Sequence, residues 1–278
     1  MPEAVAAGIR ARDALAMARA RLADAGCDSP GLDAELLLAA ALGVERSRLF
    51  IDAPALVEGE PLERFEALVR RRAAREPVAY LLGHKAFRRL SIAVDRRVLI
   101  PRPETELLVE AGLSLAAGAR VADVGTGSGA VALALKDERP DLVVMGTDSS
   151  EDAVALGREN ARRLGLDVSF ACADLLNGVA GPFDAVLANL PYVAEGAGAS
   201  LPPEIRLYEP PCALFPGADG LEVVRRLVES AAQVPFLALE VGFDQGMAVA
   251  RLLEDAGFVR VERLRDLAGH ERVIVGHR

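Results

Sequence analysis

The feature that most constrains the fold is a regular alternation of short apolar runs and helical patterns after Pro103. This alternation is typical of α/β proteins, in which helices connect the parallel strands of a twisted sheet. Too few residues separate the last two runs for a crossover helix, so the final strand is expected to be antiparallel. The sequence therefore predicts a doubly wound, mostly parallel sheet. The expected strands are residues 120–124, 142–147, 168–171, 184–188, 236–241, 258–264 and 272–275.

The region before this alternation has a helical pattern. Ala, Leu, Arg and Glu dominate residues 1–76, and apolar residues recur there at helical spacing. Gly26 and Gly43 are suited to end helices, whereas Ser29-Pro30 and Pro61 are suited to begin them. We expect a small helical bundle.

A β-like region lies between these two parts. From His84 to Ile100 apolar runs are broken by charged residues, and Asp95-Arg96 is expected to form the turn between two strands. The sequence thus predicts three parts, which are a helical bundle at residues 1–76, a β-hairpin connector at 77–102 and an α/β domain at 103–278.

Composition excludes several classes of protein. Of the 278 residues, 51% are hydrophobic and 26% charged, a balance that argues against intrinsic disorder. Cys27, Cys172 and Cys212 are far apart and have no CxxC spacing, so neither a disulfide framework nor a zinc site is indicated. The N-terminal stretch carries charges every few residues and resembles neither a secretory signal nor a membrane span. We expect a cytoplasmic protein that binds no metal and contacts no membrane.

The charge distribution argues against broad binding of nucleic acid. The net charge is −9, whereas phosphate binding needs clustered Lys and Arg. One strip, residues 85–102, has six basic residues and one acidic residue, a net of +5. This strip is either a solvated strand face, which is the commoner case, or a contact for an acidic or RNA-bound partner.

The first expected strand runs into a glycine-rich turn, VADVGTGSGAVALAL, with glycine at every second position from Gly125 to Gly129. Glycine lets the backbone approach a ligand, and the N-terminus of the following helix offers free N–H groups. The spacing differs from the dinucleotide-binding GxGxxG pattern. Asp123 precedes the turn, Asp148 ends the second strand and Asp174 follows the third. Because an acid at the tip of the second strand can bind ribose hydroxyls, we predict an adenosine-containing cofactor at the carboxyl ends of the strands.

The fourth expected strand ends in the tetrapeptide Asn189–Tyr192, with the sequence Asn-Leu-Pro-Tyr. An Asn carboxamide, a carbonyl restrained by the following proline and an aromatic face together form a receptor for a flat NH2 group. On its own, the tetrapeptide is equally consistent with an Asn-Pro turn and a packed Tyr.

DVGTGSG, the acid at Asp148 and the tetrapeptide resemble the class I S-adenosylmethionine-dependent methyltransferases that act on amino groups. Over nearly the whole chain, including EPVAYLLGHKAF, IPRPETELLVE and GHERVIVGHR, the sequence is similar to the PrmC/HemK family. These are protein-(glutamine-N5) methyltransferases that modify the Gly-Gly-Gln glutamine of peptide chain release factors. IPRPETE (Ile100–Glu106) is the most discriminating segment, because the sister family that acts on a ribosomal protein usually differs after its IPR.

The resemblance implies a Rossmann-like, mostly parallel seven-stranded sheet with an antiparallel last strand, plus an N-terminal helical bundle that binds substrate. It implies S-adenosyl-L-methionine as cofactor and S-adenosyl-L-homocysteine as product. The turn Gly125–Gly129 would wrap the methionine part, Asp148 would bind the ribose, and Asp174 and Leu175 would flank the adenine. The implied cofactor residues are Gly125, Thr126, Gly127, Ser128, Gly129, Asp148, Asp174, Leu175 and Asn189, and the implied catalytic and substrate-binding residues are Asn189, Leu190, Pro191 and Tyr192.

The tetrapeptide departs from the usual Asn-Pro-Pro-Tyr of the family at Leu190. The loss of a proline from a fixed loop lowers its rigidity, at a cost in stability of ~0.4–1 kcal/mol. Leucine keeps the backbone carbonyl, however, and Pro191 still restrains Leu190. We hypothesise that the Asn189 side-chain oxygen and the Leu190 carbonyl accept the two N–H bonds of the substrate amide, while Tyr192 packs against its side chain. Catalysis would then depend on proximity and electrostatic preorganisation.

Three alternatives stay open at this point. Asn-Leu-Pro-Tyr also resembles adenine-N6 methyltransferases of RNA or DNA, although in those the helical domain follows the catalytic one. The second alternative is methylation of a glutamine of a ribosomal protein, and the third is binding of cofactor or release factor without catalysis. We expect a release factor as protein partner and no direct contact with nucleic acid.

Overall fold

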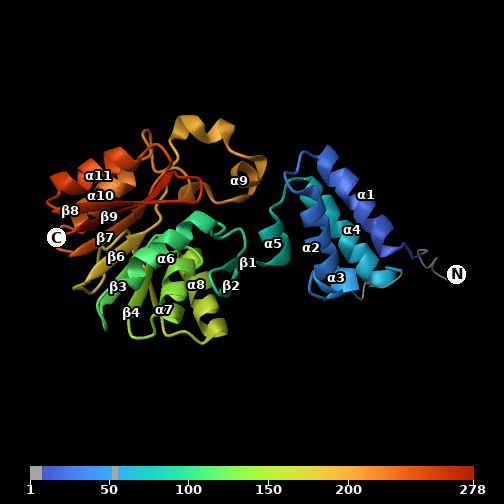
Figure 1. Ribbon diagram of the computed structural model, residues 1–278, viewed down its shortest axis with the longest axis horizontal. Helices are drawn as coiled ribbons and strands as arrows, with labels where there is room; N and C mark the ends of the chain where they lie inside the picture. Colours follow the sequence, from blue (N-terminus) through green and yellow to red (C-terminus); the bar gives the residue numbers. More distant parts are fainter. Residues whose placement is uncertain (1–7, 52–55) are drawn as a thin grey trace. The chain divides into compact units, whose positions relative to one another are not determined.

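The computed structural model describes residues 8–51 and 56–278. These residues form two compact units (Figure 1). The first, the helical unit, comprises the chain up to Gly83 together with Pro202–Tyr208, and the second, the sheet unit, comprises His84–Leu201 and Glu209–Arg278. The first seven residues of the N-terminal stretch discussed above lie outside the described residues. Within those that are described, no helix has both the length and the apolar character needed to cross a membrane.

The helical unit confirms the expected helices and their ends. Ser29 precedes α2 with Pro30 in its first turn, and Gly43 ends the same helix in the left-handed conformation (φ 68°). Alanine and leucine side chains from α1, α2 and α4 form its core. The helices are α1 (Ala11–Asp24), α2 (Pro30–Leu42), α3 (Arg48–Ile51), α4 (Gly59–Ala73), α5 (Val78–Leu82) and the distant α9 (Pro203–Tyr208).

Partly buried ion pairs hold α9 in the helical unit. Glu204 Oε1 accepts hydrogen bonds from Arg72 Nη1 and Arg75 Nε, both at 2.8 Å, and its Oε2 accepts one from Arg75 Nη2 at 2.7 Å. Arg72 also donates to Asp33 Oδ2 at 2.7 Å, and the Tyr208 hydroxyl donates to the Ala74 carbonyl at 2.7 Å. A short helix that is far away in sequence is therefore attached to the N-terminal helices by charge-assisted hydrogen bonds.

The sheet unit contains the predicted seven-stranded sheet, in the order β5-β4-β3-β6-β7-β9-β8. All pairs from β5 to β7 are parallel, and β9 runs antiparallel to both neighbours. The expected antiparallel final strand is thus confirmed. The strands are β3 (Arg120–Val124), β4 (Val143–Asp148), β5 (Ser169–Cys172), β6 (Ala185–Ala188), β7 (Phe236–Glu240), β8 (Arg260–Arg265) and β9 (Glu271–His277).

Helices cover both faces of this sheet, as a doubly wound fold requires. One face carries α6 (Glu106–Leu113), α7 (Ala130–Glu138) and α8 (Glu151–Leu164), and the other carries α10 (Glu222–Ser230) and α11 (Gly246–Asp255) (Figure 1). The strands β3, β6 and β7 are buried on both faces, because their side chains pack against both helical layers.

The hairpin exists, but the prediction of its turn was wrong. The strands β1 (His84–Phe87) and β2 (Leu90–Ala93) are antiparallel and meet at Arg88-Arg89, whereas Asp95-Arg96 follows the hairpin. Arg88 adopts a positive φ of 50°, and its guanidinium lies 2.8 Å from Glu138 while its N–H donates to Glu106. These tertiary partners stabilise a turn that local sequence preferences do not indicate.

Candidate active site

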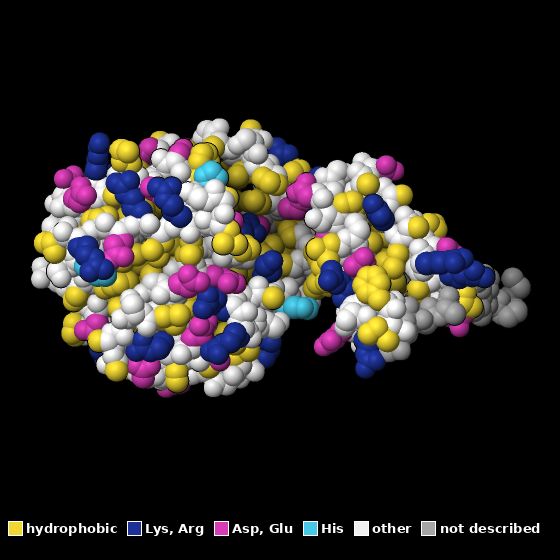
Figure 2. All heavy atoms as spheres, viewed as in Figure 1, with side chains coloured by type: hydrophobic (Ala, Val, Ile, Leu, Met, Phe, Trp, Pro, Cys, Tyr) yellow, Lys and Arg dark blue, Asp and Glu magenta, His cyan; other side chains and the backbone are white. Residues whose placement is uncertain are grey.

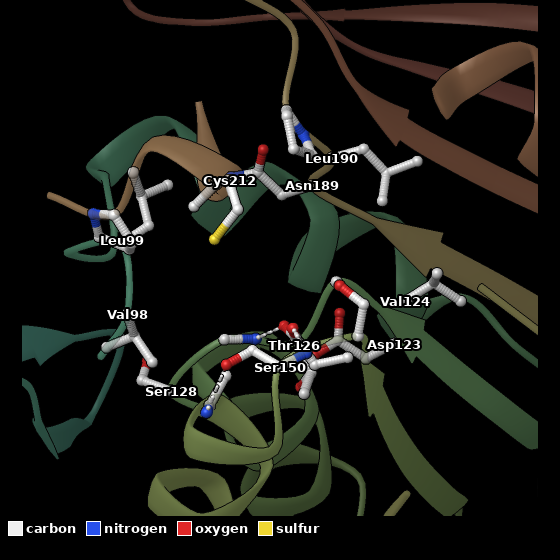
Figure 3. A pocket seen from close by; sticks show the side chains of 18 of the residues that line it. Val98, Leu99, Asp123, Val124, Thr126, Ser128, Ser150, Asn189, Leu190 and Cys212 are labelled. Carbon is white, nitrogen blue, oxygen red and sulfur yellow. Dashed lines mark hydrogen bonds between the residues drawn. The ribbon is translucent and has the colours of Figure 1, made fainter. Parts of the chain in front are cut away.

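A pocket opens at the carboxyl ends of the central strands, entirely within the sheet unit (Figure 3). Residues after β3, β4, β5 and β6 line it, which is the usual place for a ligand in open α/β sheets. Of the predicted site residues, Gly129 and Tyr192 are not among the lining residues. Those that are comprise Gly125, Thr126, Gly127, Ser128, Asp148, Asp174, Leu175, Asn189, Leu190 and Pro191.

The glycine turn departs from the geometry that other residues adopt easily. Gly125, Gly127 and Gly129 all have positive φ, of 73°, 54° and 81°. A Cβ on Gly125 would lie 3.1 Å from the Asn189 carbonyl oxygen, so only glycine permits this close approach between the two loops. Open space surrounds the Cβ position of Gly127, where a ligand can meet the backbone.

A buried acid fixes the glycine turn. Asp123 Oδ2 accepts hydrogen bonds from the Thr126 hydroxyl at 2.6 Å and from the Ala132 N–H at 3.1 Å. Burial raises the pKa of Asp123 to about 6, although these two hydrogen bonds oppose the rise. Asp123 also lines the pocket, but its Oδ2 already accepts from two groups of the protein, so its main effect is to fix the conformation of the turn.

Asp148 connects the tip of β4 to the same turn. Its Oδ2 accepts from the Gly127 N–H and its Oδ1 from the Ser150 N–H, both at 2.9 Å. Burial raises the pKa of Asp148, and the hydrogen bonds from Ser150 and Gly127 oppose the rise. This carboxylate lines the pocket and retains lone pairs that can accept hydroxyl donors.

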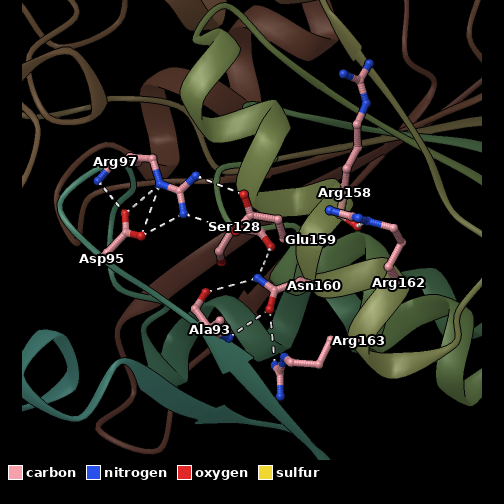
Figure 4. Close-up of polar contacts among 9 residues, drawn as sticks. All are labelled: Ala93, Asp95, Arg97, Ser128, Arg158, Glu159, Asn160, Arg162 and Arg163. Carbon is pink, nitrogen blue, oxygen red and sulfur yellow. Dashed lines mark hydrogen bonds and ion pairs between the residues drawn. The ribbon is translucent and has the colours of Figure 1, made fainter.

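The hairpin is attached to the glycine turn through one buried amide (Figure 4). Asn160 on α8 donates from Nδ2 to the Ala93 and Ser128 carbonyls, both at 3.0 Å, and accepts from the Ala93 N–H at 2.9 Å. Nearby, Arg97 pairs with Asp95 at 2.8 Å and with Glu159 at 3.2 Å. One side chain thus ties β2, α8 and the pocket wall together, a role that sequence reasoning did not assign.

The tetrapeptide follows β6 at the opposite side of the pocket. Asn189 donates from Nδ2 to the Thr105 hydroxyl oxygen at 3.2 Å. The Leu190 side chain is buried in the core beside Leu175, which explains how the chain tolerates leucine there. The Tyr192 carbonyl accepts from Gln245 Nε2 at 3.0 Å, and burial raises the pKa of the Tyr192 hydroxyl to about 12.

The two residues expected near the adenine differ in their surroundings. Leu175 has a positive φ of 58°, its side chain packs in the core, and its carbonyl accepts from the Thr147 hydroxyl at 3.1 Å. Asp174 is exposed and pairs with Arg226 of α10. Sequence reasoning missed Arg226, together with Thr105 and Cys212, although all three line the pocket.

The basic strip of residues 85–102 is largely balanced by acids of the same unit. Arg88 contacts Glu138 and Glu110, Arg89 contacts Asp137, and Arg102 contacts Glu209. On the face in Figure 2, basic and acidic side chains are interspersed over the sheet unit. The strip therefore does not offer the clustered uncompensated charge that phosphate binding needs.

Comparisons with known proteins agree with this arrangement. The PrmC N-terminal domain model matches residues 13–83, and the methyltransferase small domain model matches residues 103–201. The chain covers most of several curated relatives, each named release factor glutamine methyltransferase. The relative from Rhodospirillum rubrum is 42% identical over 93% of this chain and 82% of its own length. The relative from Pseudomonas aeruginosa is 44% identical over 90% and 94%, and that from Deinococcus radiodurans is 40% identical over 96% and 98%.

Solved structures share the fold. A methyltransferase from Pyrococcus furiosus aligns with a TM-score of 0.53 at 20% identity, over 69% of this chain and 91% of that one. A 16S rRNA N2 methyltransferase from T. thermophilus, in complex with AdoMet and guanosine, aligns with a TM-score of 0.51 at 18% identity, over 70% and 49%. At these identities the likeness establishes a methyltransferase fold.

Proposed function

The chain belongs to the release factor glutamine methyltransferase family, and from this premise we propose that it methylates the amide nitrogen of the glutamine in the Gly-Gly-Gln motif of peptide chain release factors. The methyl donor is S-adenosyl-L-methionine and the product S-adenosyl-L-homocysteine. The observation that carries the proposal is the approach of the Gly125 turn to the Asn189 loop within one pocket, 3.1 Å from a Gly125 Cβ position to the Asn189 carbonyl.

The residues of the pocket fit the cofactor. Asp148 is an acceptor that suits the hydroxyl pair of a ribose, and the open space at Gly127 lets a ligand meet backbone N–H groups. All four of Asp174, Leu175, Thr126 and Ser128 line the pocket, and in this proposal the first two border the adenine and the last two belong to the turn around the methionine part. When bound, S-adenosyl-L-methionine supplies a methyl group on a positively charged sulfur, which makes it an electrophile.

The protein's contribution is to orient a weak nucleophile. The lone pair of an amide nitrogen is delocalised into its carbonyl, so the nitrogen must be held with that lone pair aimed at the methyl group. In this proposal Asn189 Oδ1 and the Leu190 carbonyl accept the two amide N–H bonds, and Pro191 restrains the conformation of Leu190. Tyr192 packs against the glutamine side chain. The rate enhancement comes from proximity and fixed dipoles.

The helical unit provides a second contact for the release factor. Support comes from the match of residues 13–83 to a separate domain model and from two exposed apolar side chains on α3, Phe50 and Ile51, which are 68% and 73% exposed. Replacing both by serine should raise the KM for the release factor and leave kcat and cofactor affinity unchanged. An unchanged KM would place the second contact elsewhere. The cytoplasmic location stays a prediction.

The decisive experiment is methyl transfer from radiolabelled S-adenosyl-L-methionine to a purified release factor, beside a copy in which the motif glutamine is replaced. Label on the normal factor alone is the expected result. Label on ribosomal RNA or a ribosomal protein, with none on the release factor, would overturn the proposal in favour of the alternatives set out above.

The role of Asn189 has its own test. Asn189→Ala should lower kcat about 10²–10³-fold, as the loss of one preorganised polar group does in other active sites, with the Kd for S-adenosyl-L-homocysteine within about twofold of the native value. A comparable loss in kcat and in cofactor affinity would contradict a role confined to the substrate amide.

A further inference from the structure

Beside the pocket, the structure contains a buried acid that the proposed reaction does not use. Glu240, the last residue of β7, is only 2% exposed, and its Oε2 has no hydrogen-bond partner among the described residues. A buried unpaired carboxylate oxygen costs free energy, so such groups are rare in folded proteins and tend to mark functional sites. The position of Glu240 in the sheet indicates what that function is.

Glu240 and Asn189 are neighbours at the same edge of the sheet. Ala188 of β6 pairs in register with Leu239 of β7, so the residues that follow them, Asn189 and Glu240, end adjacent parallel strands. Thr105, which is 4% exposed, lies between them at the start of α6. The Thr105 hydroxyl donates to Glu240, and its oxygen accepts from Asn189 Nδ2 at 3.2 Å.

The direction of these two hydrogen bonds decides which way the Asn189 carboxamide points. The NH2 group and the carbonyl oxygen of a carboxamide are nearly identical in shape, but the first donates hydrogen bonds and the second accepts them. The Thr105 hydroxyl has one proton, which it donates to Glu240. Its oxygen can therefore only accept a hydrogen bond, so the side-chain NH2 group of Asn189, and not Oδ1, must face it. Asn189 Oδ1 is then directed away from Thr105, and no described residue donates a hydrogen bond to it.

We propose that Glu240 and Thr105 are positioning residues that act in series. Glu240 fixes the Thr105 hydroxyl, and Thr105 holds the Asn189 carboxamide with Oδ1 toward the substrate amide. The inference rests on the proposed role of Asn189 as an acceptor. The pKa of Glu240 is raised to about 7, mainly by burial and in smaller part by Glu104, although Thr105, Arg272 and Arg102 act to lower it. A carboxyl group keeps an oxygen that can accept from the Thr105 hydroxyl whether or not its other oxygen carries a proton.

The test compares isosteric and conservative variants of the full chain. Thr105→Val removes the hydroxyl with little change in volume, whereas Thr105→Ser keeps it. Glu240→Leu removes the acceptor, whereas Glu240→Gln keeps one. We expect Thr105→Val and Glu240→Leu to lower kcat roughly 10–100-fold, the loss typical when a group that orients an active-site ligand is removed. Thr105→Ser and Glu240→Gln should recover most of kcat, and the Kd for S-adenosyl-L-homocysteine should stay within about twofold.

A double-mutant cycle separates positioning from general support of the fold. If Thr105 acts only through Asn189, Thr105→Val has no further effect on kcat in the Asn189→Ala background. A second, independent loss in that background would overturn the inference.

A spectroscopic readout keeps the result distinct from the proposed function. Hydrogen exchange of the Asn189 side-chain NH2, assigned in 1H–15N spectra by its disappearance in Asn189→Ala, should be slow in the native protein and Thr105→Ser and fast in Thr105→Val. Equal exchange in native and Thr105→Val protein would refute the hydrogen-bond series even if release factor is methylated. Protected exchange in a protein that methylates no release factor would uphold the series and refute only the proposed function.

Discussion

Glu204 in the helical unit is a partly buried acid and Glu240 in the sheet unit a fully buried one, and their surroundings are opposite. Burial acts to raise the pKa of Glu204, but hydrogen bonds from Arg75 and Arg72 outweigh it, and the pKa lies below its usual range. Glu240 has one hydroxyl donor, and burial raises its pKa to about 7. The helical unit thus uses charge to hold a distant segment, whereas the sheet edge retains an underpaired acid beside the proposed catalytic residue.

Among the substitutions that test this comparison, Arg72→Met is expected to have the largest effect on stability. The Arg72 guanidinium is buried between Asp33 and Glu204, and removing it leaves two acids without that partner. We expect a loss of about 3–5 kcal/mol in the unfolding free energy of the helical unit, measured by hydrogen exchange of α2 and α4. Arg70→Met in the same helix is the control, because Arg70 is exposed and lies 3.8 Å from Glu66. Equal effects of the two substitutions would mean that the buried network is no stronger than a surface pair.

Opposite pH dependences would sharpen the comparison. The folded pKa of Glu240, about 7, lies above its usual 4.5, so folding favours the protonated form and stability falls as pH rises through this window. Glu240→Gln should therefore gain stability relative to the native protein between pH 4.5 and 7, on the order of 2–3 kcal/mol. The folded pKa of Glu204 is lowered, so its contribution is complete above 4.5 and is lost as pH falls through the folded pKa.

Glu204→Gln should accordingly be less stable than the native protein at neutral pH, by a margin that shrinks in acid. Hydrogen exchange from about pH 2 to 8, followed in α4 for Glu204 and in β7 for Glu240, measures both slopes, the first below pH 4.5 and the second between pH 4.5 and 7. Slopes of the same sign would abolish the distinction between the two acids.

Asp123 should also lower stability as pH rises, but by less than Glu240, because its buried carboxylate accepts more hydrogen bonds. Its pKa is raised from 3.8 to about 6, so native stability should fall as pH rises between these values. Asp123→Asn retains an acceptor for Thr126 and Ala132 and should remove this slope, a relative gain on the order of 2 kcal/mol at pH 7. Denaturant titrations of the two proteins at pH 4 and 7 provide the check, and a variant that loses stability at both would show that the charge itself is needed.

The smallest change is expected for Leu190→Pro, which restores the usual family tetrapeptide. The proline would stabilise the protein by ~0.4–1 kcal/mol because it lowers the conformational entropy of the unfolded chain. It would also lose part of the packing that the buried Leu190 side chain makes in the core. A net stability change within about 1 kcal/mol is expected from thermal unfolding. A loss above about 2 kcal/mol would show that the core has adapted to leucine.

Much of the sheet was predictable because its determinants are local. The buried strands β6 and β7 give continuous apolar runs, AVLA and FLAL, and the glycine turn at 125–129 directly follows β3. The grouping of Asp148 and Asn189 at one edge follows from parallel topology.

The features that were missed depend on contacts between residues far apart in sequence. Asn160 lies in the middle of a helix and gives no sign that it will bind the hairpin and the glycine turn. The hairpin turn was misplaced because Glu138, far along the chain, stabilises the strained Arg88. Glu240 ends a strand with an ordinary pattern, and only the register of β6 with β7 brings it toward Asn189.

The attachment of α9 to the N-terminal helices has a consequence for the order in which the protein is made. Arg75 leaves the ribosome 129 residues before Glu204, its main partner. At elongation rates of about 5–20 residues per second this interval lasts roughly ten seconds, during which the nascent helical bundle carries guanidinium groups whose acid has not been synthesised. The N-terminal helices of this unit are translated before the sheet unit, yet they complete their native contacts only after β3, β4, β5 and β6 have been translated.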